Sequence, residues 1–126
     1  MSFFAREWRR LKNRCIWSWA GLVAIWRGEP SFRFWSFMNA CSAAVALVLP
    51  LSAEGRALIV ALGVLVLAAE ALNTGIEAAV DHTSSERSDL ARYAKDAASA
   101  GVALTAVAAG LAWVFLIAGV VAGSPA

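Results

Sequence analysis

The stretch EALNTGIEAAVD, residues 70–81, places polar side chains in a segment that is otherwise apolar, and it directly follows the run ALIVALGVLVLAA, residues 57–69. Its polar residues recur at steps of three or four, so a helix sets them along one face. These residues are Glu70, Asn73, Glu77 and Asp81. A charged side chain at the centre of a bilayer costs roughly 2.5 kcal/mol or more, and such residues usually serve function. We therefore predict a reaction or transport site here, with polar contacts between helices as the alternative.

The composition is that of an integral membrane protein. Hydrophobic residues make up 60% of the 126 residues, and the mean hydropathy is +0.66, which is too apolar for a soluble chain of this size. The apolar residues are grouped into runs, as they are in membrane-spanning helices. The length suits a single domain, residues 1–126.

Three apolar segments are long enough to cross roughly 30 Å of hydrocarbon as helices. We predict spanning helices at residues 32–49, 56–81 and 91–121. Pro50 closes the first segment, and Ser52 and Ser88 are candidate N-caps for the second and third. The sequence thus predicts an all-α membrane protein.

Residues 3–28 predict a helix that lies along the membrane surface. Its apolar residues form one stripe at helical spacing, made of Phe4, Trp8, Leu11, Cys15, Trp19, Leu22 and Trp26. Basic residues occupy the rest of its first half, a pattern typical of interfacial helices. A basic arm that binds nucleic acid is the alternative, but the segment adjoins spanning helices, which argues against it. Pro30 disfavours helical geometry at Glu29, so we predict a bend there.

The distribution of basic residues predicts the topology. Seven of the eleven Lys and Arg residues lie in residues 1–33, and three lie in residues 82–95, where the second apolar run has ended and the third has not yet begun. By the positive-inside rule, the N-terminus and the loop at residues 82–95 share the cytoplasmic side of the membrane. Glu77 then falls near the cytoplasmic surface, and Glu70 lies roughly 10 Å deeper, because a helix rises about 1.5 Å per residue.

These positions predict a particular chemistry. Glu29 and Glu77, from separate segments, can hold a hard cation such as Mg²⁺, which usually shares its remaining positions with phosphate oxygens. Lys95 can neutralise phosphate charge. Glu70, deeper and less hydrated, can accept a proton from an alcohol that enters from the lipid. The layout suits transfer of a phosphoryl group from a cytoplasmic nucleotide to a lipid hydroxyl.

The common nucleotide-binding motifs are missing from the sequence. There is no GxxxxGK[ST], GxGxxG, HRD or DFG, and there is no HExxH or GxSxG. A kinase site in this chain must therefore be built from helix ends.

The sequence resembles the small integral-membrane diacylglycerol kinases of bacteria, and the resemblance covers nearly the whole chain. Residues 70–81 are similar to the family pattern E-x-x-N-[ST]-x-[IVL]-E-x-x-V-D. Ala94-Lys95-Asp96 matches the family's A-K-D, with Ser99 soon after it. Residues 18–33 match an S-W-x-G-L…W…E…F-R string.

The resemblance implies a homotrimer in the bacterial inner membrane, with active sites at protomer contacts. Each protomer would have one surface helix and three spanning helices. ATP and Mg²⁺ would be required and phosphatidate would be the product. Glu70 looks like the general base, and Glu29 and Glu77 look like the metal ligands. The implied ATP contacts are Arg10, Trp17, Glu29, Glu77, Glu86, Arg87, Lys95 and Asp96. The implied lipid contacts are Ser18, Trp19, Phe32, Arg33, Glu70, Asn73, Ser99 and Trp113.

Some positions depart from the family pattern. Trp17 stands where many members carry Tyr, Trp35 stands where the Gram-negative enzymes carry an acid, and Arg87 and Ser88 differ in the nucleotide loop. An apolar residue at position 35 favours undecaprenol, the lipid alcohol of a related branch, but the whole pattern favours diacylglycerol. Two other classes stay open, a small proton-coupled multidrug exporter and a non-catalytic membrane scaffold.

Overall fold

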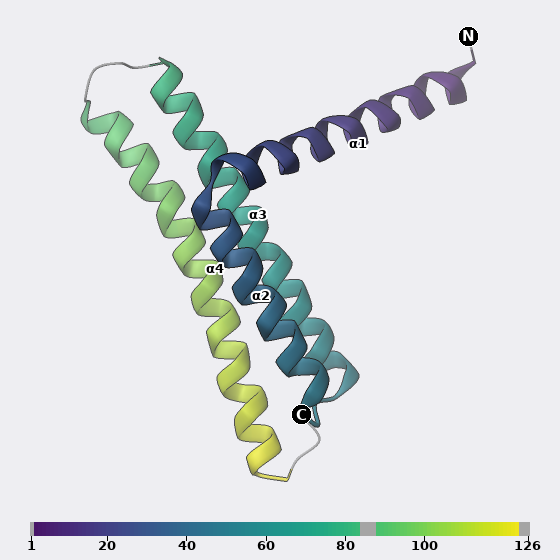
Figure 1. Cartoon of the computed structure of the whole chain (residues 1–126), viewed down its shortest axis with the longest axis vertical. Helices are drawn as coiled ribbons and strands as arrows, with labels where there is room; N and C mark the ends of the chain where they lie inside the picture. The colour runs from purple at the N-terminus through teal and green to yellow at the C-terminus, as the bar shows by residue number, and fades with distance from the viewer. Residues whose placement is uncertain (1, 84–87, 124–126) are drawn as a thin grey trace.

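The computed structural model describes residues 2–83 and 88–123, and within them the chain is entirely helical (Figure 1). This confirms the predicted all-α class. The helices are α1 (Phe3–Gly28), α2 (Pro30–Val48), α3 (Ala53–Thr83) and α4 (Asp89–Val121).

The helices begin next to their capping residues and not where the predicted apolar segments begin. The predicted surface helix has the bounds of α1, but α2, α3 and α4 each begin two or three residues earlier than predicted. Pro30 opens α2, where its fixed φ and missing N–H suit the first turn. The predicted caps are confirmed, because Ser52 Oγ accepts from Gly55 N at 3.0 Å and Ser88 Oγ accepts from Ala91 N at 3.1 Å.

A bend at Glu29 separates α1 from the rest of the chain. Glu29 has an extended backbone, with φ −110° and ψ 108°, as Pro30 predicts. Arg33 Nη1 donates to the carbonyl oxygens of Trp26 at 2.8 Å and Arg27 at 3.3 Å, so it caps the last turn of α1. Figure 1 shows α1 projecting away from the other three helices.

The helices α2, α3 and α4 form a bundle in which α3 packs against both of the others. The start of α2, the end of α3 and the start of α4 lie at the end of the bundle nearer α1 (Figure 1). The first residues of the chain and the predicted cytoplasmic loop therefore share one end. The side of the membrane that this end faces stays a prediction.

The surface of the bundle is unusually apolar. By length and composition, α3 and α4 can each cross a membrane, whereas α2 does not meet the same criteria of length, hydropathy and charge. Few apolar side chains are buried, and large ones such as Leu65, Leu104 and Phe115 are more than half exposed. A soluble monomer rarely exposes so much contiguous apolar surface. The structure thus supports two spanning helices directly, while the third predicted span, residues 32–49, stays a prediction.

The helices α2 and α3 approach each other closely at Gly63. A Cβ atom at this position would lie 2.8 Å from Asn39 Oδ1, and Asn39 is held in place because its Nδ2 donates to Trp35 O at 2.8 Å. An added methyl group must therefore displace Asn39 or push the helices apart.

We expect Gly63→Ala to have a free energy of unfolding roughly 1–3 kcal/mol below that of Gly110→Ala. Gly110 is the matched control because a Cβ there meets nothing within 4 Å, and both variants gain the same helix propensity. The difference therefore isolates the clash. Denaturation in detergent micelles measures it, and equal stabilities would show that the α2–α3 contact is not tight at this point.

Candidate active site

Three of the acidic residues of the chain share one open hollow of about 400 Å³. The hollow lies between the start of α2, the later half of α3 and the first half of α4. Its lining residues are Glu29, Ser31, Trp35, Glu70, Asn73, Thr74, Glu77, Ser99, Val102 and Ala103. The structure thus gathers Glu29, Glu70 and Glu77 from two separate segments of one chain.

Local structure explains why these acids converge. Glu29 is the N-cap of α2 and has left the helical conformation, so it sits at the corner between α1 and α2. Glu70 and Glu77 lie two turns apart on α3 and face the same hollow. Glu70 is only 4% exposed and is the one buried charged side chain among the described residues. The predicted polar face of residues 70–81 is confirmed for the three positions that line the hollow.

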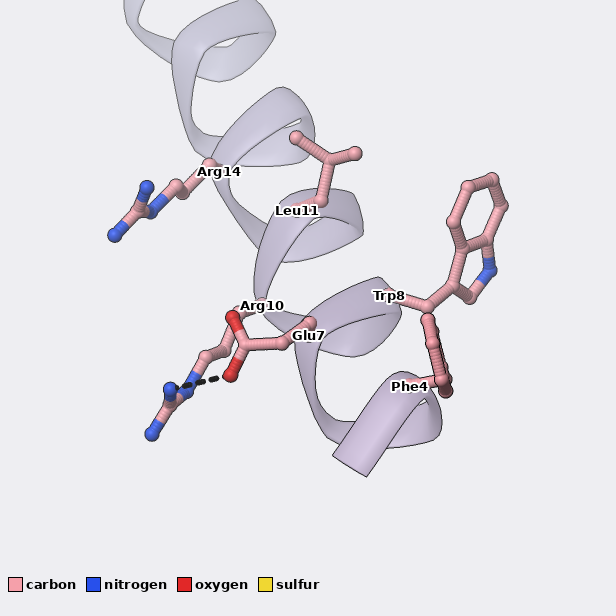
Figure 2. A pocket seen from close by; sticks show the side chains of 6 residues that line it. All are labelled: Phe4, Glu7, Trp8, Arg10, Leu11 and Arg14. Atoms are coloured by element: carbon pink, nitrogen blue, oxygen red, sulfur yellow. Dashed lines mark hydrogen bonds and ion pairs between the residues drawn. The ribbon is translucent and has the colours of Figure 1, made fainter. Parts of the chain in front are cut away.

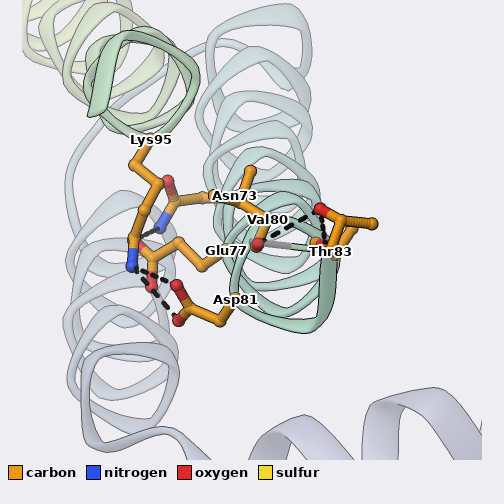
Figure 3. A network of polar contacts seen from close by, with 7 residues as sticks. Asn73, Glu77, Val80, Asp81, Thr83 and Lys95 are labelled. Atoms are coloured by element: carbon orange, nitrogen blue, oxygen red, sulfur yellow. Dashed lines mark hydrogen bonds and ion pairs between the residues drawn. The ribbon is translucent and has the colours of Figure 1, made fainter. Parts of the chain in front are cut away.

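Asn73 forms a hydrogen bond with Glu77, one of the acids of α3 that line the hollow. Its Nδ2 donates to Glu77 Oε1 at 3.1 Å, one helical turn away (Figure 3). Its Oδ1 is buried and accepts no hydrogen bond from the part of the chain that is described. Asn73 therefore orients the Glu77 carboxylate and leaves one amide oxygen without a partner.

The polar face of α3 ends at Asp81, which forms an ion pair with Lys95 of α4. Lys95 Nζ donates to Asp81 Oδ1 at 3.0 Å and to Oδ2 at 3.2 Å. Figure 3 shows Lys95 reaching from α4 past Asn73 and Glu77 to Asp81. The Lys95 ammonium group thus lies beside Glu77 and Asp81, the last two acids of the polar face. Asp96, the next residue in the chain, is exposed.

The donor set of the hollow fits a hard cation that is only partly held by protein. Within residues 2–83 and 88–123, no three Asp, Glu, His or Cys side chains form a complete metal cage. Glu29 and Glu77 are nevertheless two carboxylates on one hollow. Mg²⁺ is commonly bound by one or two carboxylates together with substrate phosphates, so these residues fit it better than they fit Zn²⁺ or a caged Ca²⁺.

Several residues predicted to contact the lipid lie elsewhere. Ser99 and Asn73 line the acidic hollow, but Trp19 and Phe32 line a second, mostly apolar hollow of about 490 Å³ between α1, α2 and α3. Arg33 is engaged with the end of α1, and Ser18 is exposed on α1.

Trp113 lies far from the acids. Its Nε1 donates to Ser42 Oγ at 2.8 Å, and its ring packs on the cluster of Ala46, Leu51 and Ile59 near the opposite end of the bundle. Ser99 and Trp113 are fourteen positions apart on α4, which is roughly 21 Å along a helix. The single chain therefore gives Trp113 a packing role between α2 and α4.

The predicted nucleotide contacts are also divided. Arg10 is paired with Glu7 on its own helix at 2.7 Å, and Trp17 is exposed on α1. Figure 2 shows Arg10 and Arg14 on one side of α1 and the apolar residues Phe4, Trp8 and Leu11 on another. The first three residues of the predicted apolar stripe therefore lie apart from Arg10 and Arg14. Neither Arg10 nor Trp17 lines the acidic hollow. Glu86 and Arg87 lie outside the described residues.

Some residues that line the hollow are not among the predicted site residues. Thr74 lies four positions after Glu70 and three before Glu77, so helical spacing alone places it on the same face. Trp35, which departs from the family pattern, also lines the acidic hollow. Ser31, Val102 and Ala103 carry no motif, and only the packing of α2 and α4 on α3 identifies them.

The chain is similar to prokaryotic diacylglycerol kinases over most of its length. The family described as prokaryotic diacylglycerol kinase matches residues 16–117. A diacylglycerol kinase from Pseudomonas aeruginosa is 43% identical over 101 residues, which is 79% of this chain and 82% of that protein. A diacylglycerol kinase from Escherichia coli K12 is 36% identical over 108 residues, or 86% of this chain and 88% of the relative. One from Haemophilus influenzae is 30% identical over 103 residues, 82% of this chain and 87% of the relative.

The bond between Trp113 and Ser42 predicts a stability effect. We expect Trp113→Phe and Ser42→Ala each to lower the free energy of unfolding by roughly 1 kcal/mol, because each removes the same hydrogen bond between α2 and α4. The double variant should lose less than the sum of the two single losses, because only one bond is broken. Denaturation in detergent micelles measures all three variants, and strictly additive losses would contradict the role of this bond.

Proposed function

The chain belongs to the prokaryotic diacylglycerol kinase family, and on this premise we propose that it transfers the γ-phosphoryl group of ATP to the primary hydroxyl of diacylglycerol. The products are phosphatidate and ADP, and the reaction depends on Mg²⁺. The observation that carries the proposal is the single hollow shared by Glu29, Glu70 and Glu77. The curated relatives quoted above are all named as diacylglycerol kinases, which favours this lipid over undecaprenol.

Glu29 and Glu77 are the residues proposed to hold Mg²⁺. When bound, the ion supplies positive charge to the phosphate oxygens of the nucleotide. Asn73 keeps the Glu77 carboxylate in one orientation through its 3.1 Å hydrogen bond. Lys95 places an ammonium group beside these acids, where it can bind a phosphate oxygen, and Asp96 next to it is a proposed nucleotide contact.

Glu70 is the proposed general base. Its carboxylate is the most buried charge of the hollow, and it accepts no hydrogen bond within the described part of the chain. It can therefore take the proton of the lipid hydroxyl while the hydroxyl oxygen bonds to the γ-phosphorus and the bond from that phosphorus to ADP breaks. Ser99 and Asn73 line the same hollow and are proposed to position the alcohol.

The membrane arrangement is part of the proposal. Besides α3 and α4, we propose that α2 spans the bilayer, because its 19 residues measure roughly 28 Å at 1.5 Å per residue. The helix α1 lies in the cytoplasmic interface of the inner membrane with its apolar stripe toward lipid. Residues 1–126 form one domain that assembles into a homotrimer. In that assembly, Arg10, Trp17, Glu86 and Arg87 are proposed to reach the nucleotide.

The apolar hollow between α1, α2 and α3 suits the acyl part of a lipid that enters from the bilayer. Trp19 and Trp26 of α1, Phe32 of α2 and Leu67 of α3 line it, and Phe32 is buried at its edge. Sites for small molecules are lined mainly by hydrophobic and aromatic side chains, as this hollow is. We propose that it receives the acyl part of the substrate.

The substrate and the base can be tested together in mixed micelles. We expect ATP-dependent phosphorylation of diacylglycerol to be faster than that of undecaprenol, and Glu70→Gln to lower kcat at least about 100-fold with a smaller change in KM. Glu54→Gln is the matched control, because Glu54 is an exposed acid in the first turn of the same helix. Equal turnover in wild type and Glu70→Gln would remove Glu70 as the base, and faster use of undecaprenol would reassign the lipid.

The metal ligands can be tested through the Mg²⁺ dependence of turnover. Chelation of Mg²⁺ should abolish activity, and Glu29→Gln and Glu77→Gln should each raise the Mg²⁺ concentration for half-maximal rate by about tenfold or more. Glu54→Gln should leave this concentration unchanged. A Mg²⁺ titration that is the same in all four proteins would show that neither acid binds the ion.

A further inference from the structure

The ion pair between Asp81 and Lys95 differs from two other surface ion pairs of the chain. Arg10–Glu7 and Arg92–Asp89 each join residues three positions apart on one helix. Lys95 instead crosses from α4 to α3 and contacts both oxygens of Asp81, fourteen positions away, at 3.0 and 3.2 Å. The pair therefore fixes where the Lys95 ammonium lies relative to α3.

The ion pair holds the Lys95 ammonium group beside the acidic hollow. Asp81 lies one helical turn beyond Glu77, which lines the hollow and is bonded to Asn73. Figure 3 shows the Lys95 side chain passing Asn73 and ending next to the carboxylates of Glu77 and Asp81. An ammonium group has three donor hydrogens, so two contacts to Asp81 leave capacity for an oxygen of another group.

Stability alone does not explain this contact. The side chain of Asp81 is 66% exposed and that of Lys95 is 36% exposed. Ion pairs this exposed contribute between zero and roughly 1 kcal/mol to folding, because water screens them and two long side chains must be held still. The same immobilisation has a different value for a ligand, since a lysine held in place in advance loses less freedom when a ligand binds.

We propose that Asp81 is a positioning residue that holds Lys95 beside Glu77 for the phosphate groups of the nucleotide. Asp81 need not touch the nucleotide, because it acts through the ammonium group of Lys95. This inference rests on the proposed function, in which Lys95 binds a phosphate oxygen.

The test measures binding of the Mg²⁺ complex of a non-hydrolysable ATP analogue to the full chain in detergent micelles by calorimetry. We expect Asp81→Asn to weaken binding about threefold to tenfold, the range expected when one long side chain must be ordered at binding. Asp81→Glu should bind more tightly than Asp81→Asn, because the carboxylate it retains can still pair with Lys95. Asp89→Asn is the matched control, since it removes an exposed carboxylate that pairs with Arg92 within α4 and not with Lys95, and it should not change binding.

A second set of measurements separates the positioning of Lys95 by Asp81 from an effect of Asp81 on folding. In a Lys95→Met background, Asp81→Asn should cause no further loss of binding, because its effect passes through Lys95. The midpoint of thermal unfolding of Asp81→Asn should shift from that of wild type by no more than the midpoint of Asp89→Asn does, which is about one degree. In kinetic assays, Asp81→Asn should raise the KM for ATP more than it lowers kcat.

The outcomes distinguish this inference from the function on which it rests. If wild type binds the nucleotide complex and Asp81→Asn binds it equally or more tightly, the positioning role is wrong while the kinase proposal stands. If the loss persists unchanged in the Lys95→Met background, Asp81 acts without Lys95 and the inference is also wrong. If wild type binds no nucleotide complex, the proposed function fails and the inference fails with it.

Discussion

The structure depends on how an almost fully buried carboxylate is accommodated within a membrane helix. Glu70 is 4% exposed on α3, the helix that packs against both α2 and α4. Leaving such a charge against acyl chains would be costly, so the side chain faces a hollow that also contains Asn73, Glu77 and Ser99. The contacts of α2 and α4 with α3 are therefore what keep the acid away from lipid.

The break between α1 and α2 completes the site. Because Pro30 removes Glu29 from the helix, the Glu29 carboxylate stands at a corner instead of continuing along the outer face of one long helix. Arg33 then caps the last turn of α1 and fixes its direction relative to the bundle. One proline thus serves two purposes: it turns the amphipathic helix away from the bundle axis and brings a third acid to the hollow.

The small buried core is consistent with a protein whose stability comes in part from its surroundings. In the described residues, few apolar side chains are buried, and only Ala46 and Val66 are as little as 1% exposed. Close approach at Gly63 contributes to the α2–α3 contact. Small residues and single polar bonds, such as that from Trp113 to Ser42, are the usual contacts between membrane helices. The exposed aliphatic faces of α3 and α4 suit lipid or another subunit, and the aromatic stripe of α1 suits the interface.

Local spacing and local chemistry were enough to predict the helical class, the break at Glu29, the caps at Ser52 and Ser88 and the polar face of α3. The family also followed from motifs that are contiguous in the chain. Residue spacing could not show that Asp81, and not Glu77, pairs with Lys95, or that Arg33 caps α1 and Trp113 bonds to Ser42. Those contacts join different helices, and the relative rotation and tilt of the helices decide them. Only the tertiary structure could therefore separate the residues that share the acidic hollow from those that hold the bundle together.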